Sequence, residues 1–284
     1  MNNPPNPWVP DFASQSPLFE PLREIARPFA RFTASWPELS DYQQVLDTQA
    51  KPVLTQSGRR LKIVAQDARP QRYEEHYSPR IYATGELQTR RHNWHDYFQF
   101  LTWLMFPQTK AQINALHVPH VETRLKPGGD AGRRTPLENM LSLFDEGGAV
   151  VLSSDPSLLQ LIRDFQWKPL FWERRADLAN HLECITFGHA LYEKALSPYV
   201  GMTANTLLLE VDRAYFQWPM MQRLHELDRR LADLFGTGLD YREPRDLQPF
   251  PILGMPGWDA ANCESTYYDN DRYFRSGRRP ALVI

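Results

Sequence analysis

The stretch Gly147-Gly148-Ala149-Val150-Val151-Leu152-Ser153-Ser154-Asp155-Pro156 decides the fold class of this 284-residue chain. Its apolar run, 149–152, has the length and composition of a buried strand, and Asp155 followed by Pro156 is typical of a helix N-terminus. Further along, the sequence predicts strands over 182–187 and 206–211 and helices over 189–196 and 220–235. Strands that alternate with helices indicate a mixed or parallel sheet. One uninterrupted helix over 176–196 is the alternative, and it would remove a strand.

We therefore expect a single α/β or α+β domain with a small mixed sheet, many helices and a long irregular C-terminal tail. Residues 1–15 are expected to form an N-terminal arm and residues 16–284 the domain, including a wrapping tail over 237–284. Thr135-Pro136-Leu137-Glu138 is typical of a helix start. The other predicted elements are a helix over 17–32 that Pro28 breaks or kinks, helices over 38–49, 94–106 and 108–117, and hairpins over 53–64 and 80–88.

Proline and aromatic residues are unusually frequent. The chain has 24 Pro against 14 Gly, together with 8 Trp, 12 Tyr and 15 Phe, whereas average usage puts glycine ahead of proline. Hydrophobic residues make up 42% and charged residues 23%, as in a folded globular protein. These values exclude a collagen, a coiled coil and a disulfide scaffold, and they predict stiff connections held by aromatic rings.

The cysteines and the apolar runs bear on the cellular compartment. Cys184 and Cys263 lack the spacing of a zinc or redox site and are too few for a disulfide framework, so the reducing cytoplasm is expected. The first residues, 1–5, show neither the basic nor the apolar region of a secretory signal. The longest near-apolar run, 97–106, is too short for a bilayer, which requires about twenty residues. We predict a cytoplasmic protein with no membrane partner.

The charges are unevenly distributed along the chain. Residues 51–134 contain 14 basic and 7 acidic residues, a balance of +7, whereas the rest of the chain has a balance of −9. A basic segment of this kind suits an anionic ligand such as a phosphate or a nucleic acid. Because its arginines come singly or in pairs without a helical stripe, we favour the interpretation that these charges scatter over the surface and pair with the acidic remainder of the chain.

Four stretches together resemble a known family. They are Asn93-Trp94-His95-Asp96-Tyr97-Phe98 leading to Trp103-Leu104-Met105-Phe106-Pro107, Leu143-Phe144-Asp145-Glu146-Gly147-Gly148-Ala149, Phe187-Gly188-His189-Ala190-Leu191-Tyr192-Glu193-Lys194 and Leu253-Gly254-Met255-Pro256-Gly257-Trp258. Through them most of the chain is similar to a proteobacterial family, the domain of unknown function 3025. The resemblance implies one cooperative unit and a bacterial cytoplasmic setting, and it brings no activity, cofactor or catalytic residue with it.

Two histidines near predicted helix starts are the first candidates for chemistry. His95 is followed by Asp96 in a first turn for which Asn93 is a suitable N-cap. Adjacent helical residues do not face one another, so both cannot reach one ion in a regular helix. His189 and Glu193 are four residues apart, which suits two metal ligands or an acid–base pair on one helix face. Structural roles, in capping or in buried hydrogen bonds, are the alternative for both pairs.

Two further clusters carry weaker signals. Asp145-Glu146 precedes two glycines before a predicted strand, where a carboxylate can act as a ligand or general base, or can satisfy turn amides. His117 and His120 flank Pro119, which we expect to end a helix, so both rings could approach one ion from a loop. Surface histidines are the alternative there.

The hypothesis that combines these candidates is a metal-dependent hydrolase, although the sequence leaves open whether the protein is an enzyme. In it, His95, His189 and Glu193 bind a divalent metal ion, and Glu146 and Asp96 are the catalytic carboxylates. The metal would lower the pKa of a bound water and so supply the nucleophile. The alternative is a non-enzymatic binding or assembly protein that contacts an anionic partner through the basic segment 51–134. A ββα-metal nuclease is a third, weaker possibility, because the usual ligand spacing is not met.

Overall fold

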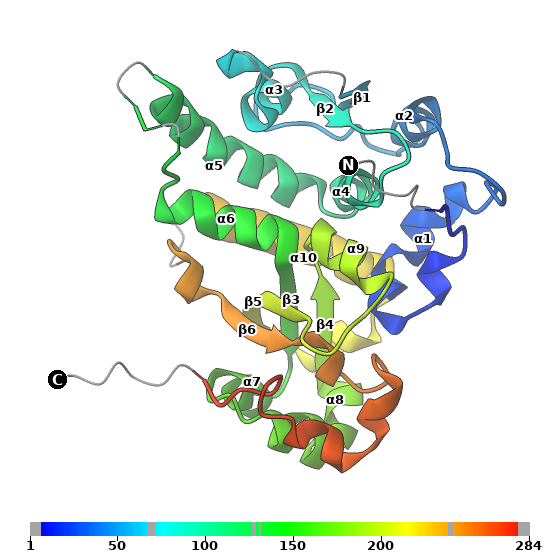
Figure 1. The fold of residues 1–284 in the computed structure, drawn as a ribbon, viewed down its shortest axis with the longest axis vertical. Coiled ribbons are helices and arrows are strands. Elements are labelled where there is room, and N and C mark those ends of the chain that lie inside the picture. The colour runs from blue at the N-terminus through cyan, green and yellow to red at the C-terminus, as the bar shows by residue number, and fades with distance from the viewer. Residues whose placement is uncertain (1–6, 67–71, 127–128, 131, 238–240, 278–284) are drawn as a thin grey trace.

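The computed structural model describes residues 7–66, 72–126, 129–130, 132–237 and 241–277, and within them it shows a mixed α+β fold with two small sheets (Figure 1). The larger sheet has the strand order β4-β3-β5-β6. β3 runs parallel to β5 and antiparallel to β4, and β6 runs antiparallel to β5, so the predicted mixed sheet is confirmed. The strand bounds are β3 Gly148–Ser153, β4 Leu182–Thr186, β5 Thr203–Glu210 and β6 Gln248–Pro251.

The apolar stretch that decides the fold class forms the interior of this sheet. Every residue of β3 is buried, as expected for a strand covered on both faces. Val150 pairs with Ile185 of β4 on one side and with Leu207 of β5 on the other. β4 also decides between the two predictions for 176–196, because helix α8 (Arg175–His181) ends where β4 begins. The strand is confirmed, and the uninterrupted helix is wrong.

Helices are layered on both sides of the four-stranded sheet. In Figure 1, α6 and α9 lie between this sheet and the pair α4 and α5, while α7 and α8 lie on its other side. The smaller sheet pairs β1 (Lys62–Ala65) with β2 (Glu86–Thr89) in parallel, next to α2 and α3. The helix bounds are α1 Arg23–Ala26, α2 Leu39–Asp47, α3 Tyr77–Thr84, α4 Trp94–Met105, α5 Pro107–Leu125, α6 Pro136–Gly147, α7 Pro156–Arg163, α9 His189–Ala195 and α10 Met220–Gly236.

Local signals explain where two important helices begin. Thr135 Oγ1 accepts the amide N–H of Glu138 (3.2 Å), and the Glu138 carboxylate accepts the amide N–H of Thr135 (2.8 Å), which is the reciprocal cap predicted for α6. The Asn93 side chain accepts the amide N–H of Asp96 (3.0 Å) at the start of α4. Both predicted helix starts are confirmed, and each fixes a turn that carries a residue of the pocket described below.

Of the two predicted hairpins, the one over 80–88 is wrong, and the one over 53–64 is only partly formed, as a short antiparallel pairing around Gly58. Residues 80–88 form the end of α3 and the start of β2 instead of two strands. Gly85, with φ at 77°, ends α3 in the left-handed conformation, so the glycine that resembles a hairpin turn is a helix C-cap. Residues 53–64 contain one antiparallel bridge, between Leu54 and Arg60, after which β1 pairs in parallel with β2.

Prolines act differently in two regions of the chain. α5 continues through Pro119 to Leu125, so the predicted end of this helix at 117 is wrong. Pro119 is exposed, where water can satisfy the carbonyl group that loses its helical partner. Pro21 and Pro28 instead divide 17–32 into 3-10 turns and the four-residue α1, a stronger break than a kink.

Aromatic rings hold both ends of the described chain against its body. Near the N-terminus, the Trp8 ring stacks on Trp94 with centroids 5.0 Å apart. Residues 241–277 contain β6 and several short 3-10 turns, and there Tyr268 stacks on Phe171 with centroids 5.9 Å apart. Irregular segments are thus anchored by ring contacts at both ends.

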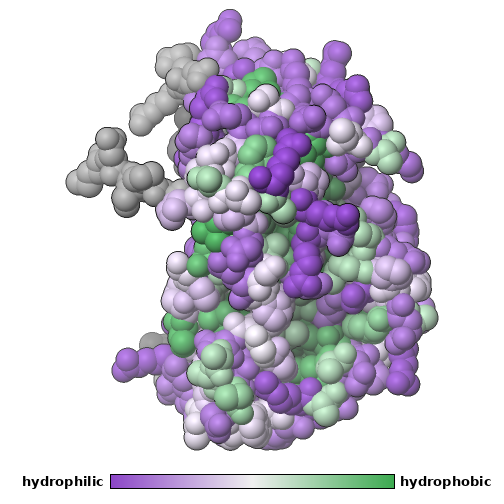
Figure 2. Space-filling view, turned by 90° about the vertical axis from the view of Figure 1, so that its right-hand side faces the viewer, coloured by the Kyte–Doolittle hydropathy of each residue, from purple (hydrophilic) through white to green (hydrophobic). Residues whose placement is uncertain are grey.

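Among the described residues, none of the helices combines the length and the apolar character that a membrane span requires. Figure 2 shows one face of the molecule, on which hydrophobic residues form separate patches among hydrophilic ones.

Candidate functional site

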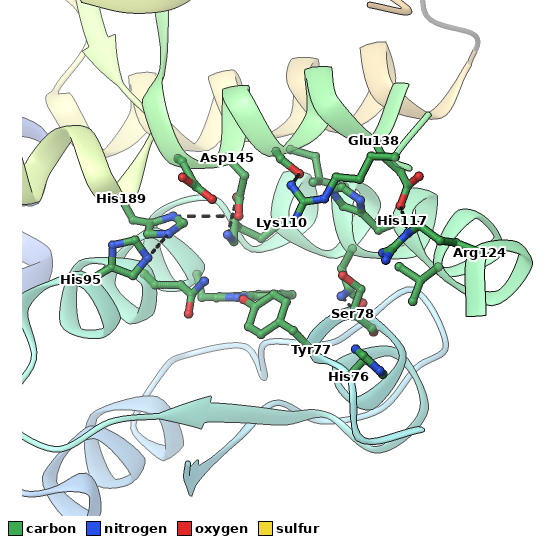
Figure 3. Close-up of a pocket in the computed structure, with 18 residues that line it drawn as sticks. His76, Tyr77, Ser78, His95, Lys110, His117, Arg124, Glu138, Asp145 and His189 are labelled. Carbon is green, nitrogen blue, oxygen red and sulfur yellow. Dashed lines mark hydrogen bonds and ion pairs between the residues drawn. The ribbon is translucent and has the colours of Figure 1, made fainter. Parts of the chain in front are cut away.

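A polar pocket of about 320 Å³ lies along α5 and α6, bordered by residues of α3 and α4 and by the first residue of α9 (Figure 3). Along α5 the lining residues recur every three or four positions, which places them on one helix face. The lining residues are His76, Tyr77, Ser78, His95, Gln99, Trp103, Lys110, Ile113, Asn114, His117, Val121, Arg124, Arg134, Glu138, Ser142, Asp145, Glu146 and His189.

Three of the residues predicted from the sequence meet at one end of this pocket. His95 Nδ1 lies 3.0 Å from a carboxylate oxygen of Glu193, and His95 Nε2 lies 3.0 Å from Nε2 of His189. The two imidazole planes are nearly perpendicular, at 80°. The side chain of His95 is 29% exposed and that of His189 is 3% exposed, so His95 is the ring that a molecule in the pocket can reach.

The partners of the two rings assign their protons. A carboxylate can only accept, so the contact with Glu193 places a proton on His95 Nδ1, and one of the two facing Nε2 atoms must donate to the other. The hydrogen bond to Glu193 raises the pKa of His95, whereas burial lowers the pKa of His189 to about 3. These opposite shifts favour His95 as the donor of the Nε2–H and His189 as its acceptor.

A buried ion pair lies beyond His189. Lys110 Nζ, on a side chain that is 3% exposed, donates to the carboxylate of Asp145, whose other oxygen lies 3.9 Å from Nδ1 of His189. Burial by itself would raise the pKa of Asp145, but the charge of Lys110 and its hydrogen bond to the carboxylate lower it overall. Asp145 is therefore ionised, but at 3.9 Å it forms no hydrogen bond with His189, whose Nδ1 has no hydrogen-bond partner among the described residues (Figure 3).

Gly188 brings the start of α9 against the end of α6. A Cβ atom on Gly188 would collide with the carbonyl oxygen of Glu146 and the amide nitrogen of Gly148. This close approach places His189, the first residue of α9, beside Asp145 in the last turn of α6. Only glycine fits at this position without moving the backbone.

The other end of the pocket contains two arginines and a neutral histidine. Arg124 Nε lies 3.5 Å from a carboxylate oxygen of Glu138, which is 2% exposed. Arg134 Nη1 lies 3.4 Å from the hydroxyl oxygen of Ser142. Burial lowers the pKa of His117 to about 4, so its imidazole is uncharged at neutral pH.

The middle of the pocket presents buried polar atoms. Asn114 is 4% exposed, and its Nδ2 donates to the carbonyl oxygen of Ser78 (3.1 Å). Since a carbonyl can only accept, this contact fixes the amide orientation and leaves Asn114 Oδ1 as an acceptor with no partner among the described residues. Nearby, the Tyr77 hydroxyl and the Trp103 indole nitrogen are buried without a well-formed hydrogen bond inside the part of the chain that the structure describes.

The two carboxylates predicted to be catalytic are separated. Glu146 lines the pocket and is exposed at its edge. Asp96 does not line the pocket, because its carboxylate accepts the backbone N–H (2.6 Å) and the guanidinium (2.7 Å) of Arg90. The geometry therefore brings no support for a role of Asp96 in chemistry.

The metal-binding prediction is neither confirmed nor refuted. Glu193 approaches His95 from the Nδ1 side, whereas His189 approaches it from the Nε2 side, so the three side chains do not converge on one point. Within the described ranges, no three His, Cys, Asp or Glu side chains are placed to share one metal ion. Metal binding by His95, His189 and Glu193 stays a prediction.

The sequence interpretation missed several lining residues and misjudged one pair. His117 and His120 lie on the continuous helix α5 rather than on a loop; His117 lines the pocket, while His120 Nδ1 lies 3.4 Å from the Thr135 hydroxyl. Lys110 and Arg124 were not singled out. The signal that could have found them is the polar stripe 110, 114, 117, 124 along one face of α5, which looks like an ordinary solvent-facing stripe.

Most of the described basic side chains of the segment 51–134 are paired with carboxylates, but most of these carboxylates lie within the segment and not in the acidic remainder that the favoured interpretation names. Arg91, which binds Glu38 at 2.7 Å, is one of the exceptions. The described basic residues of this segment that form such pairs are Lys62, Arg72, Arg80, Arg90, Arg91, Lys110, Arg124 and Lys126. The segment therefore presents fewer unpaired basic side chains than its charge balance of +7 suggests.

Comparison with known proteins places the chain in a family without adding an activity. No curated protein and no solved structure matches it. One family model, described as "Protein of unknown function (DUF3025)", matches residues 61–278, a range that includes every residue lining the pocket. Because this match covers well over half of the sequence, the chain belongs to the DUF3025 family.

Proposed function

We propose that this protein is a hydrolase-like enzyme that binds a small polar substrate between α5 and α6 and uses His95 to transfer a proton. The observation that carries the proposal is the hydrogen-bonded chain Glu193–His95–His189 at one end of a polar pocket. Carboxylate–histidine pairs of this kind hold an imidazole in a defined orientation and stabilise its charged form. His95 is the partly exposed member, so it is the ring placed to meet a substrate.

The arrangement suits general acid catalysis near neutral pH. Glu193 stabilises the proton on His95, and the neutral ring of His189 orients the Nε2–H bond. In hydrolysis, the leaving group replaces His189 as the acceptor of the His95 Nε2–H and takes that proton, water supplies the new oxygen, and proton exchange with solvent returns His95 and the base that deprotonates the water to their starting states. Glu146, at the edge of the pocket, is the candidate base for that water.

The proposal is tested by combining the titration of His95 with activity. By NMR, His95 in the whole protein should titrate above the ordinary histidine value, and Glu193→Gln should lower that value. Purified protein is then assayed on a panel of simple esters, amides and phosphate esters. Any activity should fall by about 100-fold or more in His95→Gln, which removes the proton donor. His225→Gln, which changes an exposed histidine on α10 outside the pocket, should leave the activity unchanged.

Two results would contradict the proposal. One is an activity that survives His95→Gln at the level of His225→Gln. The other is a His95 that titrates at or below the ordinary value, together with no hydrolysis of any panel member. In the second case, the chain Glu193–His95–His189 is a structural contact.

A metal-dependent hydrolase is the second candidate, and one observation favours it. The Nε2 atoms of His95 and His189 face each other at 3.0 Å, a separation that two ligands of one ion can adopt, with carboxylates near both Nδ1 atoms. Water or substrate would have to complete the coordination. Elemental analysis after loading with zinc or manganese should then show one ion per chain, and His189→Gln should abolish it. Loading without a defined stoichiometry would leave the metal-independent reaction as the better account.

The non-enzymatic alternative is a protein that contacts an anionic macromolecule through residues 51–134. Most of the basic residues described there are paired, which weakens this alternative. A gel-shift assay with nucleic acid at low salt separates the two, because salt-sensitive retention would favour the binding protein. A bacterial, cytoplasmic setting is part of the proposal; its support is that Cys184 and Cys263 are both free thiols.

A further inference from the structure

The pocket is elongated, and its two ends differ in chemistry. On α6, the lining residues run from Glu138 to Glu146, eight residues apart, which corresponds to about 12 Å along the helix axis. The end near Asp145 contains the hydrogen-bonded pair His95 and His189. The part nearer Glu138 contains Arg124 and the neutral His117 (Figure 3), and Arg134 reaches Ser142, one helical turn from Glu138. A substrate that fills the pocket therefore meets both environments.

The charges of this second end do not balance. Both oxygens of Glu138 are already engaged, one by Arg124 (3.5 Å) and the other by the amide N–H of Thr135 (2.8 Å). Arg134 has no ion pair with any carboxylate of the described residues, and its hydrogen bond is to the neutral hydroxyl of Ser142. One positive charge on this wall therefore has no local counter-charge.

The neighbours of Arg134 are hydrogen-bond donors. Arg134 is close enough to His117 to depress the pKa of that ring, and a neutral imidazole can donate one N–H. Ser142 can donate its hydroxyl hydrogen. A planar guanidinium beside further donors matches the oxygens of a carboxylate or a phosphate.

A second observation points to a ligand in the same cavity. Asn114 is 4% exposed, and its Oδ1 has no partner among the residues that the structure describes. Its position on α5 lies between Lys110, at the histidine end, and His117, at the arginine end. A buried acceptor of this kind is costly unless a donor meets it, so the middle of the pocket suits a hydroxyl or amino group.

We propose that the substrate carries an anionic group, a carboxylate or a phosphate, which binds beside Arg134 at the end of the pocket away from His95. The rest of the substrate presents a hydroxyl or amino donor to Asn114 and its reacting bond to His95. This inference rests on the proposed function for the identity of the pocket as a substrate site. It adds the substrate class, a small hydroxylated or aminated monoanion or dianion.

The test is an equilibrium titration of the full chain with inorganic phosphate and, separately, with acetate, at constant ionic strength set by sodium chloride. The signal is the ring Cε1–H resonance of His117 in the NMR spectrum, because a bound anion changes the environment of this ring and raises its pKa. We expect saturable shifts with at least one of the two anions. A preference for phosphate or for acetate distinguishes a phosphorylated substrate from a carboxylic acid.

Arg134→Gln supplies the decisive comparison. Arg134 is exposed and holds no ion pair with a described carboxylate, so this variant should fold, and its anion affinity should fall by about tenfold or more. The matched control is Arg133→Gln, which removes the same charge one residue earlier, outside the pocket, and should change the affinity less than about twofold.

Shifts that do not saturate with either anion, or equal losses in the two arginine variants, would overturn the inference. Failure here is distinguishable from failure of the proposed function. His95→Gln should retain phosphate or acetate binding while activity is lost, and Arg134→Gln should weaken anion binding while the titration of His95 is unchanged.

Discussion

The neutral state of the buried His117 makes a quantitative prediction about acid stability. Burial lowers the pKa of His117 from 6.5 to about 4 in the folded chain. In the unfolded chain the ring protonates at its ordinary value, so the unfolded state binds the extra proton below pH 6.5. The stabilisation is therefore complete above pH 6.5 and is lost as the pH falls toward about 4.

The magnitude follows from these two pKa values. Near pH 7.5 the contribution of His117 to the pH dependence is close to zero. Near pH 5, RT ln[(1 + 10^(6.5−5))/(1 + 10^(4−5))] gives a loss of about 2 kcal/mol in the free energy of unfolding. His117→Gln removes the titrating group, so the drop in stability between these pH values should be about 2 kcal/mol smaller than in the natural chain.

The assay is urea unfolding at both pH values, followed by circular dichroism. His225→Gln is the control, since His225 is exposed on α10 and outside the pocket. The comparison uses the difference between the two pH values, which cancels any general loss of stability in the variant. A pH-dependent drop in His117→Gln equal to that of the natural chain would refute the assignment of His117 as a buried neutral ring.

Three further predictions concern contacts that shape the site. Lys110→Met and Asp145→Asn should each destabilise the protein by about 3–5 kcal/mol, because each change leaves a buried charge unpaired. The double variant should lose clearly less than the sum of the two. Denaturation of the natural chain, the two single variants and the double variant measures these losses, and additive losses would argue against the ion pair. Gly188→Ala should lower the free energy of unfolding by about 1–3 kcal/mol and shift the NMR signals of the adjacent His189, because the added methyl group meets the backbone of Glu146 and Gly148. An unchanged melting temperature would contradict this close approach of the two backbones. Asp228→Ala should lower the free energy of unfolding by about 1–2 kcal/mol, because it removes the side chain that caps the start of α5. Asp228→Asn should recover part of this loss. Identical thermal or chemical melts of the two variants would show that the cap is unimportant.

The parts of the fold that the sequence predicts correctly depend on neighbouring residues. The α6 cap needs only Thr135 and Glu138, and β3 needs only a short apolar run. The predicted hairpin over 80–88 fails because one residue, Gly85, has the same conformational signature in a turn and at a helix end. What decides between them is the parallel pairing of β1 with β2, which is tertiary information.

The candidate site also contains residues that the sequence predicts and residues that only the tertiary structure reveals. His95, His189 and Glu193 stand out because histidines at helix starts and a spacing of four residues are visible in the sequence. Their actual pairing is not visible in the sequence, since Glu193 binds His95 on another helix instead of His189 on its own helix. Lys110 and Arg124 could not be assigned to a pocket, because a polar stripe on a helix usually faces water, and only the packing of α3 and α6 against α5 encloses this one.

The stacking of Trp8 on Trp94 has a consequence for how the site is supported. Trp94 and His95 are consecutive residues in the first turn of α4, and the Trp94 indole also donates to the carbonyl oxygen of Pro7 (3.2 Å). The family match begins at residue 61, so the contacts of Pro7 and Trp8 with Trp94 come from a part of the chain outside the match. Pro7 and Trp8 thus support, from outside the pocket, the helix turn that carries His95.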